Sequence, residues 1–168
     1  EAIRLYTKLL EVDPQYAHAD EVLYQLARAY DAERRPQEAL AALERLVTRY
    51  PKSPRAIEAQ FRRGEAAFVA QQWSVAEAAY SEVSAAGAGS EFYEQALYKR
   101  GWSRFKSGDL DGALDSFIVL LDRLLLTKEG GERDLGHFPR PQRELVEDTL
   151  RVCAIALAAD ELTAGIDR

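Results

Sequence analysis

The feature that most constrains the fold is a pattern of residue types that recurs every 37 residues. One column holds a small residue, and four positions later a second column holds a large one. The small residues are Ala2, Ala39, Ala76 and Ala113, and the large ones are Tyr6, Leu43, Tyr80 and Phe117. Two further columns keep the same spacing, namely Tyr24, Phe61 and Tyr98 and, three positions later, Ala27, Gly64 and Gly101. A repeat of this length predicts stacked units that bury their apolar faces against one another.

Within each unit, the spacing of apolar residues predicts two helices packed back to back. The small columns allow these helices to approach closely, and Gly is accepted there although it costs about 1 kcal/mol in a helix interior. Pro14 and Pro51 are expected to end helices. Ser53 followed by Pro54 predicts an N-cap with proline at the first helical position, and Ser90 repeats that cap. Gly108 predicts a left-handed turn between the helices of one unit.

These signals give the expected boundaries and fold class. We expect a half repeat at 1–14, full repeats at about 17–51, 54–88 and 91–127, an inserted loop at 128–140, and a partial fourth repeat at 141–168. The paired helices are expected near 17–32 and 36–50, 54–70 and 73–84, and 91–106 and 110–127. In the fourth repeat we expect one helix at 141–159 and the start of a second within 158–168. The fold is then all-α, a right-handed superhelical array of antiparallel helix pairs, and the chain is expected to be a piece of a larger protein.

Composition narrows the range of functions. With 47% hydrophobic and 30% charged residues, the chain has a globular composition. Its net charge of −6 argues against a nucleic-acid partner, because phosphate contacts depend on clustered Lys and Arg. Membrane insertion is not expected either, because no run of 18 apolar residues exists and the run at 118–126 is short and contains Asp122 and Arg123.

No catalytic residue, metal site or cofactor is predicted. His18 and His137 have no Cys or His neighbour at metal-ligand spacing. Glu144 and Asp148 have the spacing of charges on an exposed helix face. Cys153, the single cysteine, lies in an apolar run and is expected to be a buried thiol. We therefore expect that the chain is not an enzyme.

The small columns, the aromatic column ending in Phe117 and the prolines at 14 and 51 together resemble the tetratricopeptide repeat (TPR). The common form of that repeat has about 34 residues, so the present pattern is about three residues longer. Arg63 and Arg100 also depart from the family pattern, which usually has Leu there, and we expect a polar, partly exposed edge at these positions. The longer period and the stretch RYPKSPRAIEAQFRRGEAAF are similar to bacterial cell-envelope TPR proteins, including the outer-membrane assembly lipoprotein family. That similarity favours the periplasm or cell envelope over the cytoplasm.

The resemblance implies a non-enzymatic scaffold that binds a peptide or protein in a concave groove lined by the first helices. The groove positions carried over from the family are Glu21, Tyr24, Arg28, Asp31, Glu58, Phe61, Arg62, Glu65, Phe68, Gln95, Tyr98, Lys99, Trp102, Phe105 and Lys106. Tyr24, Phe61 and Tyr98 either form an aromatic stripe along the groove or pack between first helices. Trp102 with Lys99 and Lys106 has the composition of an interface anchor. The carboxylate-gripping clamp of chaperone-binding members is not expected, because the chain has no Asn and its clamp positions differ.

Two other roles are compatible with the sequence. The array could be a structural spacer, or an auxiliary domain that positions an enzyme or a polysaccharide machine elsewhere in the parent chain. It could also self-associate through ends at which an open repeat exposes apolar surface.

Overall fold

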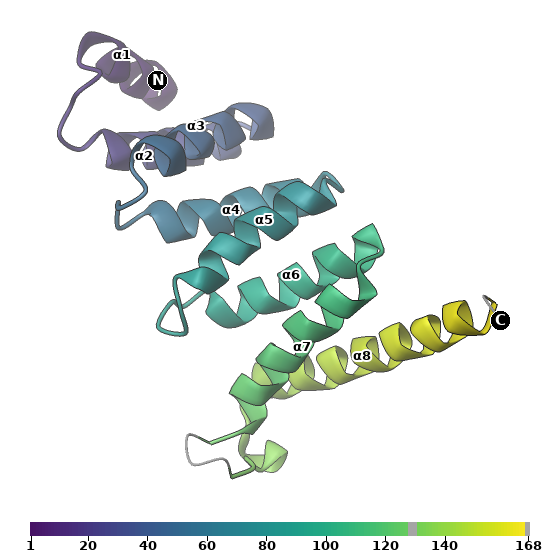
Figure 1. Ribbon diagram of the computed structural model, residues 1–168. Helices are drawn as coiled ribbons and strands as arrows, with labels where there is room; N and C mark the ends of the chain where they lie inside the picture. Colours follow the sequence, from purple (N-terminus) through teal and green to yellow (C-terminus); the bar gives the residue numbers. More distant parts are fainter. Residues whose placement is uncertain (128–130, 167–168) are drawn as a thin grey trace.

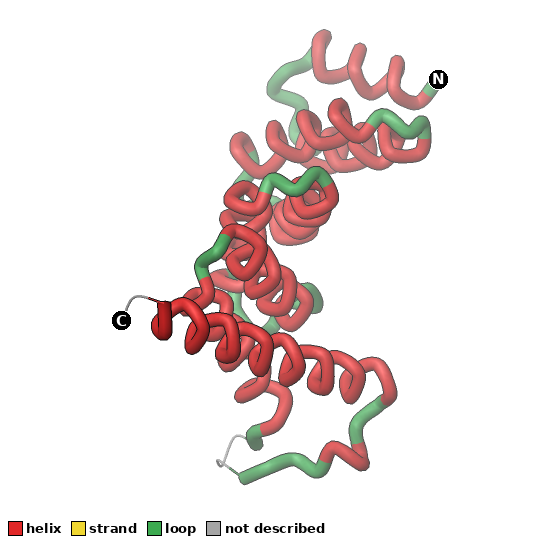
Figure 2. The backbone as a smooth tube through the Cα atoms, turned by 90° about the vertical axis from the view of Figure 1, so that its right-hand side faces the viewer, coloured by secondary structure: helices red, strands yellow, loops and turns green. Residues whose placement is uncertain are grey.

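The computed structural model is an elongated stack of helices in which successive helices run antiparallel (Figure 1). It describes residues 1–127 and 131–166, with side chains as far as Ala158 on the last helix. The α-helices are α1 (Ala2–Val12), α2 (Ala19–Ala32), α3 (Pro36–Arg49), α4 (Ala56–Val69), α5 (Trp73–Ala85), α6 (Tyr93–Ser107), α7 (Leu110–Leu125) and α8 (Arg140–Ile166). A short 3₁₀ helix, η1 (Leu135–His137), precedes α8. The predicted all-α array of helix pairs is confirmed over the described residues, and the tube in Figure 2 shows the same stack from the side.

The helices α2 to α7 begin and end within two residues of the predicted positions. The largest differences, of two residues, are at the starts of α2, α4 and α6 and at the end of α7. Helices α4 and α6 begin later than expected because Ser53 and Ser90 do not cap them. Instead, the hydroxyl of Ser53 accepts the N–H of Arg55 at 3.1 Å, and that of Ser90 accepts the N–H of Phe92 at 3.2 Å. Each serine therefore stabilises a turn that precedes the helix.

The core follows the small and large columns of the repeat. Tyr80 and Phe117 are completely buried, and they face Gly64 and Gly101 on the preceding first helices. A Cβ placed on Gly64 would lie 2.6 Å from Cε1 of Tyr80, and one on Gly101 would lie 2.5 Å from Cε1 of Phe117. Glycine is required at both positions because no side chain fits between helix and ring.

The described part of the predicted insert is attached to the end of the stack. The N–H of Thr127 donates to the carbonyl of Gly131 at 2.7 Å, and that of Arg133 donates to the carbonyl of Leu125 at 2.7 Å. Leu135 and Phe138 pack against a core cluster of Leu97, Leu120, Leu124 and Val146. Residues 131–139 thus cover the apolar ends of α6, α7 and α8. Residues 128–130 of the insert expected at 128–140 lie outside the described residues.

The prediction that a second helix begins within 158–168 is wrong for the described part of that range. Helix α8 continues without interruption from Arg140 to Ile166. Between 158 and 166 the sequence contains three alanines, the strongest helix formers, and no proline that could end the helix. Residues 167–168 lie outside the described part of the chain.

Candidate partner-binding groove

A large cleft lies over α4, between the end of α2, the start of α3 and the residue that precedes α6. Its volume is about 650 Å³. We call it the α4 cleft, and its lining consists of Asp31, Pro36, Gln37, Leu40, Glu58, Phe61, Arg62, Glu65, Ala66, Val69, Ala70, Gln72 and Phe92. Of the first-helix positions predicted for the groove, Asp31, Glu58, Phe61, Arg62 and Glu65 belong to this lining. A cleft of this size is within the usual range for ligand sites.

Apolar side chains form much of the α4 cleft. The rings of Phe61 and Phe92 stack with centroids 4.9 Å apart, and Phe61 also meets Tyr80 edge-on at 5.8 Å. Val69 is 82% exposed although it is a large apolar residue. Exposed apolar surface beside fixed aromatic rings is typical of a binding site.

Charged side chains occupy the same cleft. Arg62 lies between two of its carboxylates, with a guanidinium nitrogen 3.2 Å from Glu58 and another 4.0 Å from Asp31. Glu65 accepts the hydroxyl of Tyr80 at 2.5 Å and lies 3.4 Å from the ammonium of Lys99. These contacts fix the carboxylates beside the apolar surface.

Tyr24 and Tyr98 do not form an aromatic stripe on an open surface. Tyr24 is only 4% exposed, and its hydroxyl donates to Glu58 on the next first helix. Burial, together with that hydrogen bond, raises the pKa of Tyr24. Tyr98 on α6 makes the equivalent contact with Asp148 on α8. Tyr24 is therefore packed between first helices and is not part of an aromatic stripe along the groove.

The remaining predicted groove residues lie outside the lining of the α4 cleft. Trp102 packs edge-on against Tyr98, Phe105 and Phe117, in a cluster that also contains Val152 of α8. Lys106 lies over the Trp102 ring, with its ammonium 5.7 Å from the centroid. Lys99 lies similarly over Phe68 at 4.6 Å, and Arg28 is exposed. Glu21 is paired with Arg55 at 2.8 Å, and Gln95 is exposed.

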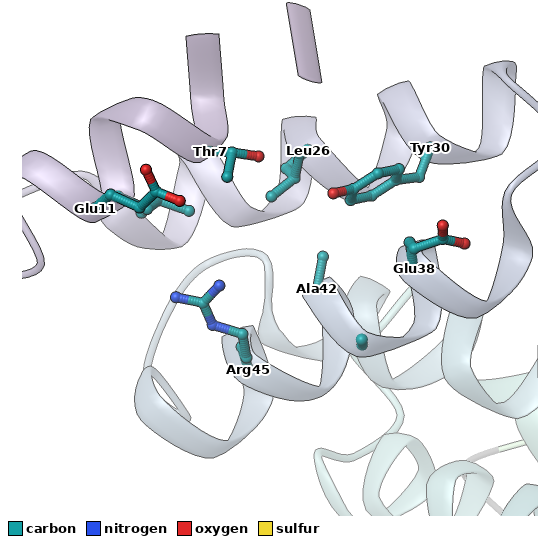
Figure 3. A pocket seen from close by; sticks show the side chains of 9 residues that line it. Thr7, Glu11, Leu26, Tyr30, Glu38, Ala42 and Arg45 are labelled. Carbon is teal, nitrogen blue, oxygen red and sulfur yellow. The ribbon is translucent and has the colours of Figure 1, made fainter. Parts of the chain in front are cut away.

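A smaller cavity of about 220 Å³ lies between α1, α2 and α3 (Figure 3). Leu26 and Tyr30 of α2 face Ala42 and Arg45 of α3 across it, and Thr7 contributes from α1 (Figure 3). The hydroxyl oxygen of Thr7 is buried there without a hydrogen-bond partner among the described residues.

Arginines occupy the corresponding positions in the next two units. Arg63, 37 residues after Leu26, pairs with Glu44 and donates to Gln60 at 2.7 Å. Arg100, a further 37 residues on, donates to the hydroxyls of Ser84 and Ser116 at 3.1 Å each. Burial, followed by the nearby Arg104, lowers the pKa of Arg100. The two arginines therefore form a polar edge, as expected, but one that is mostly covered.

Sequence reasoning missed several parts of the α4 cleft. Leu40 comes from a second helix, and Phe92 from the connection before α6, whereas only first-helix positions were considered. Asp148 was interpreted as an exposed surface charge, but it is half-buried and accepts the Tyr98 hydroxyl. Cys153 is half-buried against the Trp102 cluster, and burial raises the pKa of its thiol.

Among the side chains that the structure describes, in residues 1–127 and 131–158, His, Cys, Asp and Glu form no group of three that could hold a metal ion. In the same part of the chain, no helix combines the length and the apolarity needed to span a bilayer.

Comparisons with known proteins agree with the helical-pair architecture. The family model for the tetratricopeptide repeat matches residues 21–53 and 95–123. The crystal structure of MamA superposes with a TM-score of 0.58 at 23% identity, covering 97% of this chain and 89% of MamA. A candidate kinesin light chain of Podospora anserina with nearly identical TPR-like repeats gives a TM-score of 0.64 at 16% identity, covering 97% of this chain and 81% of that one. No curated protein sequence matches significantly. Residues 21–53 and 95–123 therefore match the tetratricopeptide repeat, and the chain shares its fold with these TPR-like helical arrays.

Proposed function

We propose that this chain is a non-enzymatic scaffold that binds an extended segment of a protein partner in the α4 cleft. The observation that carries the proposal is a cleft of about 650 Å³ that combines exposed apolar residues with ordered charges. Surface of this kind costs free energy when it is left in water, and binding a partner would remove that cost.

The position of the cleft supports the same role. Its lining includes residues from the three helices α2, α3 and α4 and from the connections before α5 and α6. A segment bound there would contact several units at once. Repeat arrays offer extended surfaces of this type because each unit contributes a similar set of positions.

We also propose that α8 is the first helix of a further repeat. The support is the hydrogen bond from Tyr98 to Asp148, which repeats the bond from Tyr24 to Glu58. In both cases a tyrosine of one first helix donates to a carboxylate of the helix that takes the next place.

The bacterial cell-envelope location stays a prediction from the sequence, as does self-association through the ends. The spacer or auxiliary role is the alternative to partner binding, and one experiment separates the two. Short random peptides would be selected by display against the purified chain, and the affinities of the selected peptides measured by fluorescence polarisation.

Two alanine-to-glutamine variants make the test specific for the cleft. Ala66 lines the α4 cleft, whereas Ala78 is exposed on α5 outside it. Ala66→Gln would fill the cleft with a neutral side chain and is expected to weaken binding about tenfold or more, which corresponds to about 1.4 kcal/mol. Ala78→Gln makes the same substitution inside a helix and should leave the affinity unchanged. Failure to select any peptide, or equal affinities for both variants, would favour the spacer role.

A further inference from the structure

The charges of the α4 cleft do not balance. Asp31, Glu58 and Glu65 are acidic, Arg62 is basic, and the other lining residues are uncharged. Two cations approach from outside the lining: Lys99 lies 3.4 Å from Glu65, and Arg55 lies 3.7 Å from Glu58 but is shared with Glu21 at 2.8 Å. Within the lining itself, three carboxylates accompany one cation.

Two of these carboxylates remain accessible. The side chains of Asp31 and Glu65 are 49% and 41% exposed, respectively. Among the described residues Asp31 has one ion-pair contact, with Arg62, which also pairs with Glu58 and lies over the Tyr24 ring. An ionised carboxylate offers about four acceptor sites on its two oxygens, so both residues can accept further hydrogen bonds from a ligand.

The apolar part of the cleft lies next to these carboxylates. Phe61 and Glu65 are one helical turn apart on α4, as are Glu65 and the exposed Val69. Phe92 extends the apolar surface by stacking on Phe61. A ligand that uses the whole cleft therefore meets aromatic rings and negative charge within a short distance.

From this arrangement we infer that the α4 cleft selects peptide segments in which a bulky apolar side chain is next to a basic one. The apolar side chain packs against Phe61 and Phe92, and the ammonium or guanidinium group binds Asp31 and Glu65. A segment with acidic neighbours is disfavoured, because like charges would be brought together in a partly desolvated site. This inference rests on the proposed function and specifies the partner's chemistry.

The test uses fluorescently labelled peptides that share one central Phe in a Gly and Ser background. In one peptide the Phe is flanked by Arg, in the second by Glu, and in the third by Ser. The Arg-flanked peptide should bind about tenfold more tightly than the Glu-flanked one at low salt, and the difference should shrink as ionic strength rises.

A pair of charge-matched variants assigns the preference to the cleft. Asp31→Asn with Glu65→Gln removes two charges from the cleft, and the glutamine can still accept the Tyr80 hydroxyl. Asp115→Asn with Glu82→Gln removes two charges from exposed positions on α7 and α5. The first pair should abolish most of the preference for Arg, and the second should keep it.

The outcomes separate this inference from the proposed function. Equal affinities for the three peptides, or a higher affinity for the Glu-flanked one, would overturn the inference. If Ala66→Gln then weakened the binding of these peptides, the cleft would still be supported as a peptide-binding site. If none of the three labelled peptides and no peptide of the displayed library binds, the proposed function fails, and this inference fails with it.

Discussion

Gly64 and Tyr80 form a complementary pair, because a Cβ on Gly64 would lie 2.6 Å from the Tyr80 ring. Gly101 faces Phe117 in the same way, whereas Ala27 occurs in the unit whose large residue is the smaller Leu43. The size of the small residue thus follows the size of its partner. Close-packed interiors require this, since a single added methyl group in a tight contact displaces a neighbour.

Gly64→Ala should therefore lower the free energy of unfolding by about 1–3 kcal/mol. Combining it with Tyr80→Leu recreates the Ala27 and Leu43 pair, so the double variant should lose less stability than the two single variants added together. Urea denaturation followed by circular dichroism measures all three. Simple additivity of the losses would show that the two residues are not coupled.

Leu26→Arg should be tolerated, although Leu26 is only 4% exposed. The cavity between α1, α2 and α3 corresponds to the spaces that Arg63 and Arg100 occupy, and it holds the unpartnered Thr7 hydroxyl as well as Glu11. We expect a change of less than about 1 kcal/mol in the free energy of unfolding, which is within the ordinary range for a substitution without strain.

The control for this prediction is Leu46→Arg, because Leu46 is completely buried and does not line the cavity. An uncompensated buried charge there should cost at least about 3 kcal/mol. Equal losses for Leu26→Arg and Leu46→Arg in urea denaturation would contradict the correspondence between the cavity and the arginine sites.

Gln71→Gly should stabilise the fold by up to about 1 kcal/mol. Gln71 has a φ of 58° and Arg34 a φ of 57°, and the corresponding residue of the third unit is Gly108, with a φ of 88°. A left-handed conformation costs a residue with a Cβ about 1–2 kcal/mol, partly offset by the greater unfolded-state entropy of glycine. In thermal unfolding, the midpoint temperature of Gln71→Gly should rise, and that of Gly108→Ala, which places a Cβ at the corresponding position, should fall. Shifts of both midpoints in the same direction would contradict the explanation.

Stability should fall as the pH rises above about 10. Burial, and secondarily a hydrogen bond to a carboxylate, raise the pKa of Tyr24, Tyr80 and Tyr98 above the ordinary value of 10.0. Between the unfolded and folded pKa values the native state binds more protons, so unfolding becomes easier as protons are removed. Each such group contributes a slope of about 1.4 kcal/mol per pH unit.

Tyr80→Phe isolates one of these groups. The variant should lose stability near pH 7, because the hydrogen bond to Glu65 disappears, yet its stability should decline less steeply between about pH 10 and 11. Urea denaturation at several alkaline pH values measures both effects. An unchanged slope would mean that Tyr80 does not contribute to the alkaline loss.

The fold could be predicted because its determinants are local and recur. The glycine and aromatic columns fix the helix pairs, and prolines and glycines separate them. The starts of α4 and α6 were predicted two residues early because a serine before a helix can stabilise either a cap or a preceding turn, and sequence does not distinguish the two. The repeat pattern predicts a break near residue 158, but α8 continues because no proline or capping turn interrupts its hydrogen bonds there.

The candidate site could be predicted only in part. Phe61, Arg62 and Glu65, which were predicted from first-helix positions, lie in the cleft lining. Leu40 and Phe92 reach the cleft from other elements, so their contribution depends on how neighbouring units are stacked. Tyr24 was predicted to line the groove but is buried, with its hydroxyl donating to Glu58 on α4. That contact also depends on how neighbouring units are stacked.

The two tyrosine–carboxylate contacts show what determines the position of each successive unit in the array. Tyr24 and Glu58 are 34 residues apart in sequence, whereas Tyr98 and Asp148 are 50 apart, a difference of 16. Since the same contact forms in both places, the surfaces of the helices, not the length of the connecting chain, set the position of the next unit. The entropic cost of a longer connection grows only slowly with its length. The connection between α7 and α8 is therefore a natural point for accepting foreign sequence, where a tag, an epitope or a small domain could be added while the helices on both sides keep their alignment.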